Sequence, residues 1–326
     1  VKVLQEFCGA MFVDRRQYKI ENICFLLGTG MNGKGVFTHA IQTVLGYCNY
    51  TAYDIPSLVN KETSIADADG KLANICPDQS RVDISGGNLK AFVSGEPMMA
   101  RWLYQNPFKA VNLPLIMVSV NDMPITTDHS YGHHRRPLPI PFNVTIDKKS
   151  ADTTLSHKIE LEVSGIFNWI VEGRRRFLEN GGKFSVCEEI EETKERTRIE
   201  SNSVLQFLRE KGYFPTPHRL LQQEFKLLAT LFQEYRDWGR ESEKKSLFEK
   251  KKFSKMLKAE KFEGLHRNNG NGYMVYMPEY GRTVEEVIAA IKQDKIDNIQ
   301  QQEERILDIK KEDFWDSLEA QANIPF

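Results

Sequence analysis

The residues best suited to chemistry lie in the glycine-rich segment GTGMNGKGVF, at residues 28–37. Gly28 is followed by four residues and then by Gly33 and Lys34. In this P-loop pattern, backbone N–H groups point inward at a polyphosphate, and the lysine reaches its β- and γ-phosphates. The pattern predicts an ATP site; a glycine-rich turn without a ligand is the alternative. The residues expected to bind ATP are Gly28, Thr29, Gly30, Asn32, Gly33, Lys34, Gly35 and Val36.

One position departs from this pattern. Gly35 follows the lysine, where a serine or threonine hydroxyl usually binds Mg²⁺. Thr38 lies one helical turn further on and can at best act through water. We therefore expect Mg²⁺ to depend on phosphates, on waters and on an acidic residue elsewhere in the chain.

Two polar residues follow apolar runs and are expected at strand ends. Asp78 comes after the short run at residues 71–76, where an ATPase places the acid that holds Mg²⁺ and polarises the attacking water. Asp83 lies close enough to compete for this role, and a simple turn residue is the alternative. Asn121 ends the nearly continuous apolar run at residues 113–120, where its amide can orient the water or contact the γ-phosphate.

A basic segment, HSYGHHRRPLPIPFNV, follows these strands. Its histidines, His129, His133 and His134, lack a fourth ligand at the spacing of a known zinc site. Its paired arginines, Arg135 and Arg136, are candidates to supply charge to the γ-phosphate of a neighbouring subunit. A basic surface loop is the alternative interpretation.

A second group of basic residues lies between the two expected strands at residues 71–76 and 113–120. Lys90, Arg101 and Lys109 are interleaved with aromatic residues, which suits contact with a nucleic-acid backbone. A solvated hairpin with a packed underside fits equally well. The aromatic residues are Trp102, Tyr104 and Phe108.

These residues need a scaffold of strands and helices. The run ICFLL at residues 23–27 predicts a buried strand before the P-loop, and a helix should follow it until Gly46. Residues 155–178 have the apolar spacing of one long amphipathic helix, and a short amphipathic helix is expected within residues 1–22. The predicted fold class is α/β, with a P-loop ATPase core at residues 1–183.

A smaller α+β domain is predicted at residues 204–279, after a charged linker helix at residues 184–203. Three helical runs precede a hairpin signal at Asn271-Gly272, which together describe a winged helix. Lysines concentrate on its last helix, and Lys252 and Lys255 are the expected DNA contacts. A lysine-rich solvated helix, in a domain that contacts protein, is the alternative. Residues 280–326 form a charged tail.

Composition narrows the class of protein. The chain has 326 residues, 40% of them hydrophobic and 27% charged, and its net charge is −1. It can bury a core for two domains, and no apolar run approaches the length of a membrane span. Five scattered cysteines without a CxxC pair argue for a reduced, cytoplasmic protein. Because residue 1 is valine, we expect the chain to be a segment of a longer protein.

The order of five blocks resembles the helicase part of phage, plasmid and poxvirus primase-helicases, which belong to helicase superfamily III. The likeness extends over roughly residues 1–280. The blocks are GTGMNGKGVF, LKAFVSGEPMMAR, MVSVNDMP, HHRRPLPIPF and LEVSGIFNWIVEGRRRFLENGGKFS.

The resemblance implies an AAA+-like ATPase that forms a ring, usually of six subunits, and moves along DNA with ATP sites between subunits. Lys34 would be the phosphate lysine, Asp78 the acid of the second motif and Asn121 the sensor asparagine. Arg135 or Arg136 would be the arginine finger, and Lys90 and Arg101 fall in the segment that precedes and builds a DNA-facing hairpin. The sequence leaves open whether a primase domain precedes Val1. Gly35, and an aspartate where the family more often has glutamate, put hydrolysis and metal binding in doubt.

Two other functions remain open at this point. A P-loop kinase for small molecules shares the strand, loop and lysine, but it needs a lid and an acceptor pocket. A replication initiator that binds ATP and DNA without turnover is favoured by Gly35.

Overall fold

The computed structural model describes residues 1–79, 86–124, 135–147, 152, 154–244, 246–268, 270–298 and 300–301. The chain divides into two compact units, Val1–Ser201 and Asn202–Phe326. The boundaries of the four segments expected from the sequence, at residues 183, 203 and 279, stay predictions. In the described part of the chain, no helix is long and apolar enough to cross a membrane.

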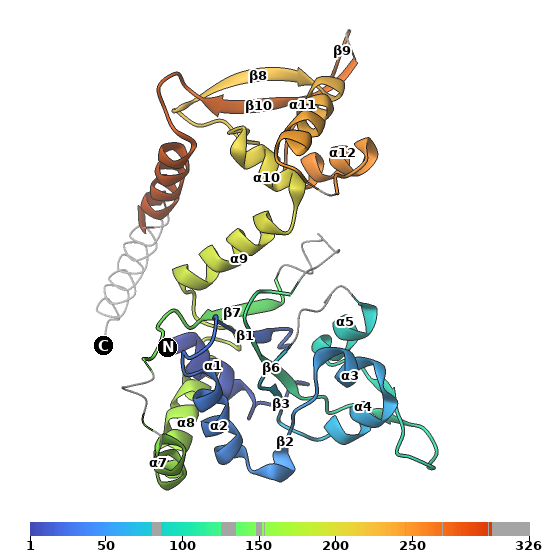
Figure 1. Ribbon diagram of the computed structural model, residues 1–326, viewed down its shortest axis with the longest axis vertical. Helices are drawn as coiled ribbons and strands as arrows, with labels where there is room; N and C mark the ends of the chain where they lie inside the picture. The colour runs from blue at the N-terminus through green and yellow to red at the C-terminus, as the bar shows by residue number, and fades with distance from the viewer. Residues whose placement is uncertain are drawn as a thin grey trace, which may run out of the picture. The chain divides into compact units, whose positions relative to one another are not determined.

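The first unit is built on a five-stranded parallel sheet with the order β2-β3-β6-β1-β7 (Figure 1). This sheet confirms the α/β class predicted from the sequence. All residues of β3 and β6 are buried, as expected for strands covered on both faces. The strands are β1 (Ile23–Leu27), β2 (Tyr50–Thr51), β3 (Ala73–Cys76), β6 (Leu115–Val120) and β7 (Pro137–Pro141).

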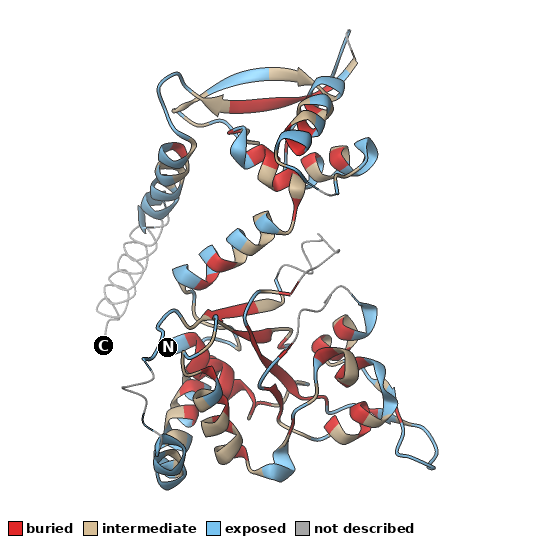
Figure 2. Ribbon diagram, in the orientation of Figure 1, coloured by how far each residue is buried: buried red, intermediate tan, exposed pale blue. Residues whose placement is uncertain are grey.

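Helices lie on both sides of this sheet, whose strands are largely buried (Figure 2). Alternate strand residues pack against each helix layer. One layer holds α1 (Lys2–Ala10), α2 (Lys34–Leu45) and α8 (Val163–Glu179). The other holds α3 (Ile55–Asn60), α4 (Glu62–Ala68) and α5 (Gly87–Ser94). The remaining elements of the unit are η1 (Tyr47–Asn49), the hairpin strands β4 (Met98–Ala100) and β5 (Phe108–Ala110), α7 (Leu155–Leu161), and α9 (Glu188–Glu200), which packs against β7.

Two helices differ from the sequence prediction. The single helix expected over residues 155–178 is interrupted at Glu162, whose φ of −104° and ψ of 17° are not helical, so that α7 and α8 are separate. Helix α1 forms within residues 1–22 as expected but lacks the solvent-exposed face of an amphipathic surface helix, because every residue from Val3 to Ala10 is buried. It crosses α8 closely, since a Cβ atom added at Gly173 would lie 2.1 Å from the carbonyl oxygen of Gln5.

The register of the sheet decides which residues can meet. Leu27 lies beside Val120, and Cys76 lies beside Val118, so β1, β3 and β6 end at the same edge. The P-loop, Asp78 and Asn121 follow these strand ends. At the opposite edge Ile23 lies beside Pro137, so Arg135 and Arg136 come just before β7 begins.

The second unit contains α10 (Ser203–Glu210), β8 (Leu221–Leu227), α11 (Leu228–Glu241), α12 (Lys250–Ala259), β9 (Gly264–Arg267) and β10 (Gly270–Pro278). Its antiparallel sheet has the order β8-β10-β9. The sequence prediction gave the three helices and a hairpin but missed β8. That strand is mostly polar and lies at the sheet edge, with no fully buried residue. The prediction also put the hairpin turn at Asn271-Gly272, which is wrong, because these two residues lie within β10 and pair with His266 and Leu265 of β9. Residues 284–298 are helical, and residues 302–326 lie outside the described part.

Candidate nucleotide-binding site

The P-loop connects β1 to α2, as the sequence predicts. The geometry of the turn explains why several of its residues are glycine. Gly28 donates its N–H to Val120 O at 3.1 Å, and a Cβ atom there would lie 2.7 Å from Phe142 O. Gly30 and Gly33 have φ angles of 108° and 85°, which residues with side chains rarely adopt. The turn can therefore form only because these positions are glycine.

The mouth of this turn offers unpaired hydrogen-bond donors. Among the described residues, nothing accepts a hydrogen bond from the N–H groups of residues 29–36. Gly33 is the N-cap of α2, and its first turn contains no acidic residue. Free N–H groups and the positive end of the helix dipole together make a site for an anion.

Lys34 lies inside this turn. Its exposed fraction is 7%, and its Nζ donates to Gly28 O and, at 3.2 Å, to Asn32 Oδ1. Asn32 Nδ2 in turn donates to Phe142 O at 3.3 Å. Burial lowers the pKa of Lys34 from its ordinary value, while the charge of Asp78 acts in the opposite direction. Asn32 thus holds the ammonium group in place, a role beyond the phosphate contact expected from the sequence.

Asp78 and Asn121 both lie exposed at the edge of the sheet that carries the P-loop. The backbone around Asp78 is fixed, because Asp78 O accepts from Cys76 Sγ at 3.4 Å and the next residue, Gln79, donates its N–H to Ser119 O at 2.9 Å. Asp83, the competing acid, lies outside the described residues.

Gln79 is a positioning residue that the sequence analysis missed. Its side chain is buried and accepts a hydrogen bond from the N–H of Ile55 at 2.8 Å. It therefore ties α3 to the end of β3 directly beside Asp78. A polar residue next to an acid gave no signal in the sequence, because its partner lies 24 residues away.

The donor set fits the polyphosphate of a nucleotide better than it fits a metal held by protein alone. Space around Gly35 is open, since no atom lies within 4 Å of an added Cβ. Thr38 is buried, and its hydroxyl donates to Gly35 O at 3.0 Å. In the part of the chain that the structure describes, no three His, Cys, Asp or Glu side chains group as metal ligands. A metal that arrives with the phosphates would have Asp78 as its protein ligand.

The two arginines lie at the other edge of the sheet from the P-loop. β1 has five residues, so the edges are about 16 Å apart at roughly 3.3 Å per residue. Arg135 contacts Glu21, and Arg136 accepts through its main-chain oxygen the N–H of Ile23 at 3.0 Å. Neither can therefore reach the P-loop of its own subunit without unfolding this edge. His129, His133 and His134 lie outside the described residues.

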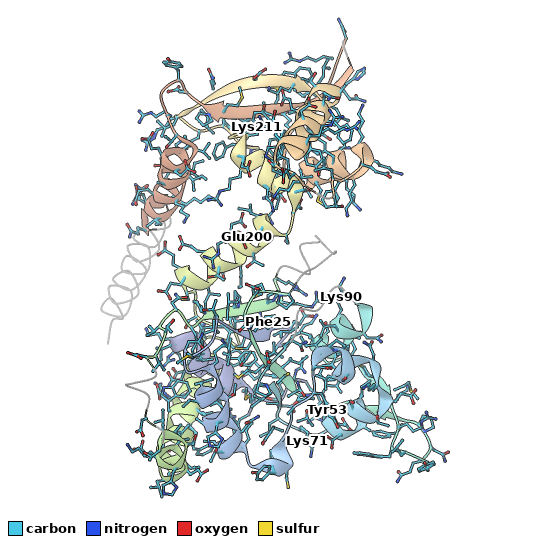
Figure 3. The ribbon with its side chains drawn as sticks, in the orientation of Figure 1. Phe25, Tyr53, Lys71, Lys90, Glu200 and Lys211 are labelled. Atoms are coloured by element: carbon cyan, nitrogen blue, oxygen red, sulfur yellow. The ribbon has the colours of Figure 1, made fainter. Side chains whose placement is uncertain are left out.

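The three basic residues expected to contact nucleic acid, Lys90, Arg101 and Lys109, do not form one continuous surface. Arg101 and Lys109 are exposed on this antiparallel hairpin, and Arg101 Nε lies 3.2 Å from a carboxylate oxygen of Glu62. Lys90 is half-buried on α5 and lies apart from the hairpin (Figure 3). The exposed tip carries Trp102, Leu103 and Tyr104, whereas Phe108 packs against the core.

Helix α12 of the second unit presents lysines on its outer side. Phe253 and Leu257 are buried against the unit, while Lys252 and Lys255 are exposed. Lys252 Nζ lies 3.9 Å from the centre of the Phe248 ring, a cation–π contact. The further exposed lysines of this region are Lys250, Lys251, Lys258 and Lys261.

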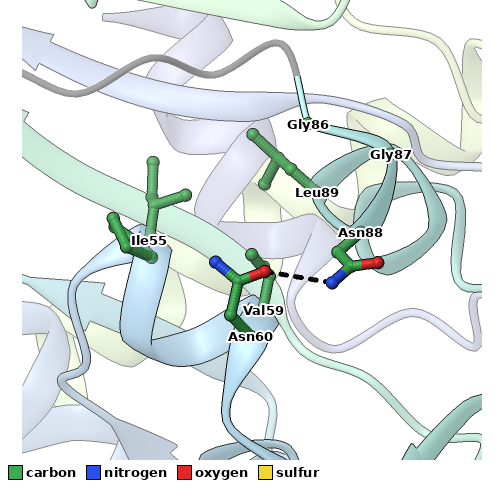
Figure 4. Close-up of a pocket in the computed structure, with 8 residues that line it drawn as sticks. Ile55, Val59, Asn60, Gly86, Gly87, Asn88 and Leu89 are labelled. Atoms are coloured by element: carbon green, nitrogen blue, oxygen red, sulfur yellow. Dashed lines mark hydrogen bonds between the residues drawn. The ribbon is translucent and has the colours of Figure 1, made fainter.

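A cavity of about 500 Å³ lies between α3 and the start of α5 (Figure 4). Its floor is apolar, with Ile55, Val59 and Leu89, and Asn88 Nδ2 donates to Asn60 Oδ1 across it at 3.0 Å. None of the residues predicted to bind phosphate lines this cavity.

Comparison with known proteins supports the resemblance seen in the sequence. A family described as a family of unknown function (DUF5906) matches residues 26–136, from the end of β1 to the arginine pair. A candidate helicase of Acanthamoeba polyphaga mimivirus is 28% identical over an alignment of 188 positions that covers 49% of this chain. The chain resembles a viral helicase. It spans only 19% of the length of this relative.

Two solved structures are also similar in part. The C-terminal region of NrS-1 in its apo form is 9% identical, with a TM-score of 0.47, over 85% of this chain and 71% of that one. The JCV helicase, solved with a small molecule bound, is 11% identical, with a TM-score of 0.28, over 64% of this chain and 63% of that one.

Proposed function

We propose that this chain is the ATP-hydrolysing helicase module of a viral or mobile-element replication protein of the superfamily III type. The observation that carries the proposal is the P-loop. Among the described residues, the N–H groups of residues 29–36 have no partner, Lys34 is buried in the turn, and Asp78 and Asn121 lie at the same edge of the parallel sheet. A glycine-rich turn that binds no ligand would not need a buried lysine close to an acidic residue.

In this proposal the residues of the site have separate roles. The free N–H groups of residues 29–36 and Lys34 bind the phosphates of ATP, and Asp78 holds Mg²⁺ together with phosphates and waters. Asp78 and Asn121 orient the water that attacks the γ-phosphate. ATP supplies the bond whose hydrolysis drives the module along DNA.

The ATP site is completed by a second copy of the chain. The separation of about 16 Å between the edges of the sheet supports action of Arg135 or Arg136 in a neighbouring subunit. We further propose that subunits form a ring, with six as the number usual in the resembled family.

DNA contacts are proposed on both units. The element order α10-β8-α11-α12-β9-β10 supports a winged helix, in which α12 would be the recognition helix and Lys252 and Lys255 would contact the phosphates. In the first unit, Arg101 and Lys109 would contact the DNA backbone and the exposed Trp102 and Tyr104 its bases. Lys90 stays a weaker candidate because it is half-buried.

The test is ATP hydrolysis with and without single-stranded or forked DNA. We expect DNA to stimulate hydrolysis and Lys34→Ala to abolish it. Lys71→Ala is the control, because Lys71 donates to Cys48 O at 2.8 Å, outside the P-loop. If Lys34→Ala hydrolyses ATP at the rate of Lys71→Ala, the proposed function is wrong.

A second candidate function is favoured by Gly35. A module that lacks a hydroxyl for Mg²⁺ at this position fits a replication initiator that binds ATP and DNA without turnover. Tight ATP binding without release of phosphate, in the presence of DNA and Mg²⁺, would support it over the helicase.

A further inference from the structure

Glu21 is a carboxylate that the sequence analysis did not single out, and it lies beside the arginine pair. It precedes β1, and the exposed fraction of its side chain is 12%. One of its oxygens accepts a hydrogen bond from Ser94 Oγ at 3.0 Å and lies 3.3 Å from Lys19 Nζ. The other carboxylate oxygen of Glu21 contacts the guanidinium of Arg135. A carboxylate this little exposed is stable only where such partners surround it, so its position is fixed.

The two neighbouring arginines are held differently. The side chain of Arg135 is 50% exposed and contacts Glu21. Arg136 is half-buried, and its Nη2 lies 3.5 Å from Ser94 Oγ on the last residue of α5. Asn22 Nδ2 fixes the main chain of both, by donating to Arg135 O at 3.2 Å and Arg136 O at 3.4 Å. Arg135 therefore points to the surface from a fixed base, while Arg136 faces its own subunit.

We propose that Arg135 is the arginine that acts on the γ-phosphate bound by a second copy of this chain, and that Glu21 positions it. This inference rests on the proposed function and decides between the two arginines. A guanidinium is planar, and it stabilises a transferring phosphoryl group only in the right orientation. The fixed carboxylate supplies that orientation before the subunits meet, so less side-chain freedom is lost when they do.

The charge of Glu21 is maintained by its surroundings. Burial acts to raise its pKa, but the Ser94 hydrogen bond and the charges of Lys19 and Arg135 hold the pKa below its ordinary value. Glu21 is thus ionised at neutral pH and can orient the guanidinium. Arg15, which is largely buried nearby, is a further positive charge that interacts with the carboxylate of Glu21.

The variant Glu21→Gln tests the positioning role. The amide oxygen can still accept the hydrogen bond from Ser94, but the charge that orients Arg135 is lost. We expect kcat for ATP to fall on the order of tenfold, the size of one lost charged hydrogen bond, with KM for ATP unchanged. Arg135→Ala should lower kcat by about 10³, and Arg136→Ala by less. Asp14→Asn is the matched control, because Asp14 pairs with Arg16 on the surface at 2.8 Å.

Mixed assemblies distinguish positioning from a general structural role. A Glu21→Gln subunit mixed with a Lys34→Ala subunit should regain activity, because some interfaces pair an intact P-loop with an intact Arg135. The same subunit mixed with Arg135→Ala should not regain it. Should Glu21→Gln fail to fold, Ser94→Ala removes the hydrogen bond that Ser94 donates to Glu21 and is expected to give a smaller loss with the same mixing pattern.

The inference is overturned by a wild-type kcat for folded Glu21→Gln, by a loss in Arg136→Ala that exceeds the loss in Arg135→Ala, or by recovery with Arg135→Ala subunits instead of Lys34→Ala subunits. An inactive Lys34→Ala protein together with a fully active Arg135→Ala protein overturns this inference alone. A fully active Lys34→Ala protein overturns the proposed function as well.

Discussion

The close crossing of α1 and α8 predicts how a substitution at the crossing point changes the stability of the first unit. The change is Gly173→Ala on α8. Its new Cβ would lie 2.1 Å from the carbonyl oxygen of Gln5 and 2.9 Å from Gln5 Cγ. Because the first contact is with the backbone of a buried helix, no side-chain rotation can relieve it. The two helices must move apart by about 1 Å to restore ordinary van der Waals contact.

Two effects of opposite sign contribute to the stability of this variant. Alanine is favoured over glycine within a helix by about 1 kcal/mol. Overpacking costs about 1–3 kcal/mol, and here the cost should lie at the upper end because backbone must move. The hydrogen bonds from Arg176 to Gln5 Oε1, at 3.1 Å, depend on the same spacing between helices. We expect a net loss of about 2 kcal/mol.

The matched control lies on the same helix. Gly165 is exposed, and nothing lies within 4 Å of a Cβ atom added there, so Gly165→Ala should gain up to about 1 kcal/mol. Because the chain has two compact units, amide hydrogen exchange of peptides from α1 and α8 should be measured, which reports on this unit alone. Equal protection in the two variants would refute the reasoning from contact distances.

Three further predictions concern the functional surfaces. Gly35→Ser places a hydroxyl in open space and should lower the Mg²⁺ concentration needed for half-maximal hydrolysis; an unchanged requirement would show that Mg²⁺ is held elsewhere. Lys252→Ala with Lys255→Ala should reduce the slope of log K against log salt for duplex DNA by about 1.8, whereas the exposed Lys211→Ala should leave it unchanged. Because the pKa of Glu21 is lowered in the folded protein, its contribution to stability is present above its unfolded pKa and is lost as pH falls through the folded value. Wild type and Glu21→Gln should therefore converge in stability below that folded pKa; parallel acid unfolding curves would contradict this.

Elements with a strong local pattern could be predicted from the sequence. The strand ICFLL, the following glycine turn and the helix to Gly46 are where the sequence places them, because buried parallel strands and P-loops have specific compositions. The short run at residues 71–76 and the run at residues 113–120 likewise contain β3 and β6. The edge of the sheet that carries Lys34, Asp78 and Asn121 follows from strand order alone.

Features that depend on tertiary contacts could not be predicted. β8 is polar and is stabilised by pairing with β10, so its sequence gives no strand pattern. Gln79 and Glu21 gain their roles from partners 24 and 73 or more residues away. The burial of α1 all round likewise depends on α8, which lies more than 150 residues further along the chain.

The placement of the P-loop and Arg135 at opposite edges of one sheet limits the symmetry of any assembly that uses both. A two-fold dimer can combine the two edges only reciprocally, with the P-loop of each copy against Arg135 of the other, so that both sites lie in one interface and the assembly stops at two. A head-to-tail contact instead places one site at each interface, and it closes into a ring or continues as a helical filament. An open chain of subunits always has one complete site fewer than it has members. Closure therefore adds a site without adding a subunit, and ATP that binds at complete sites would favour the closed form.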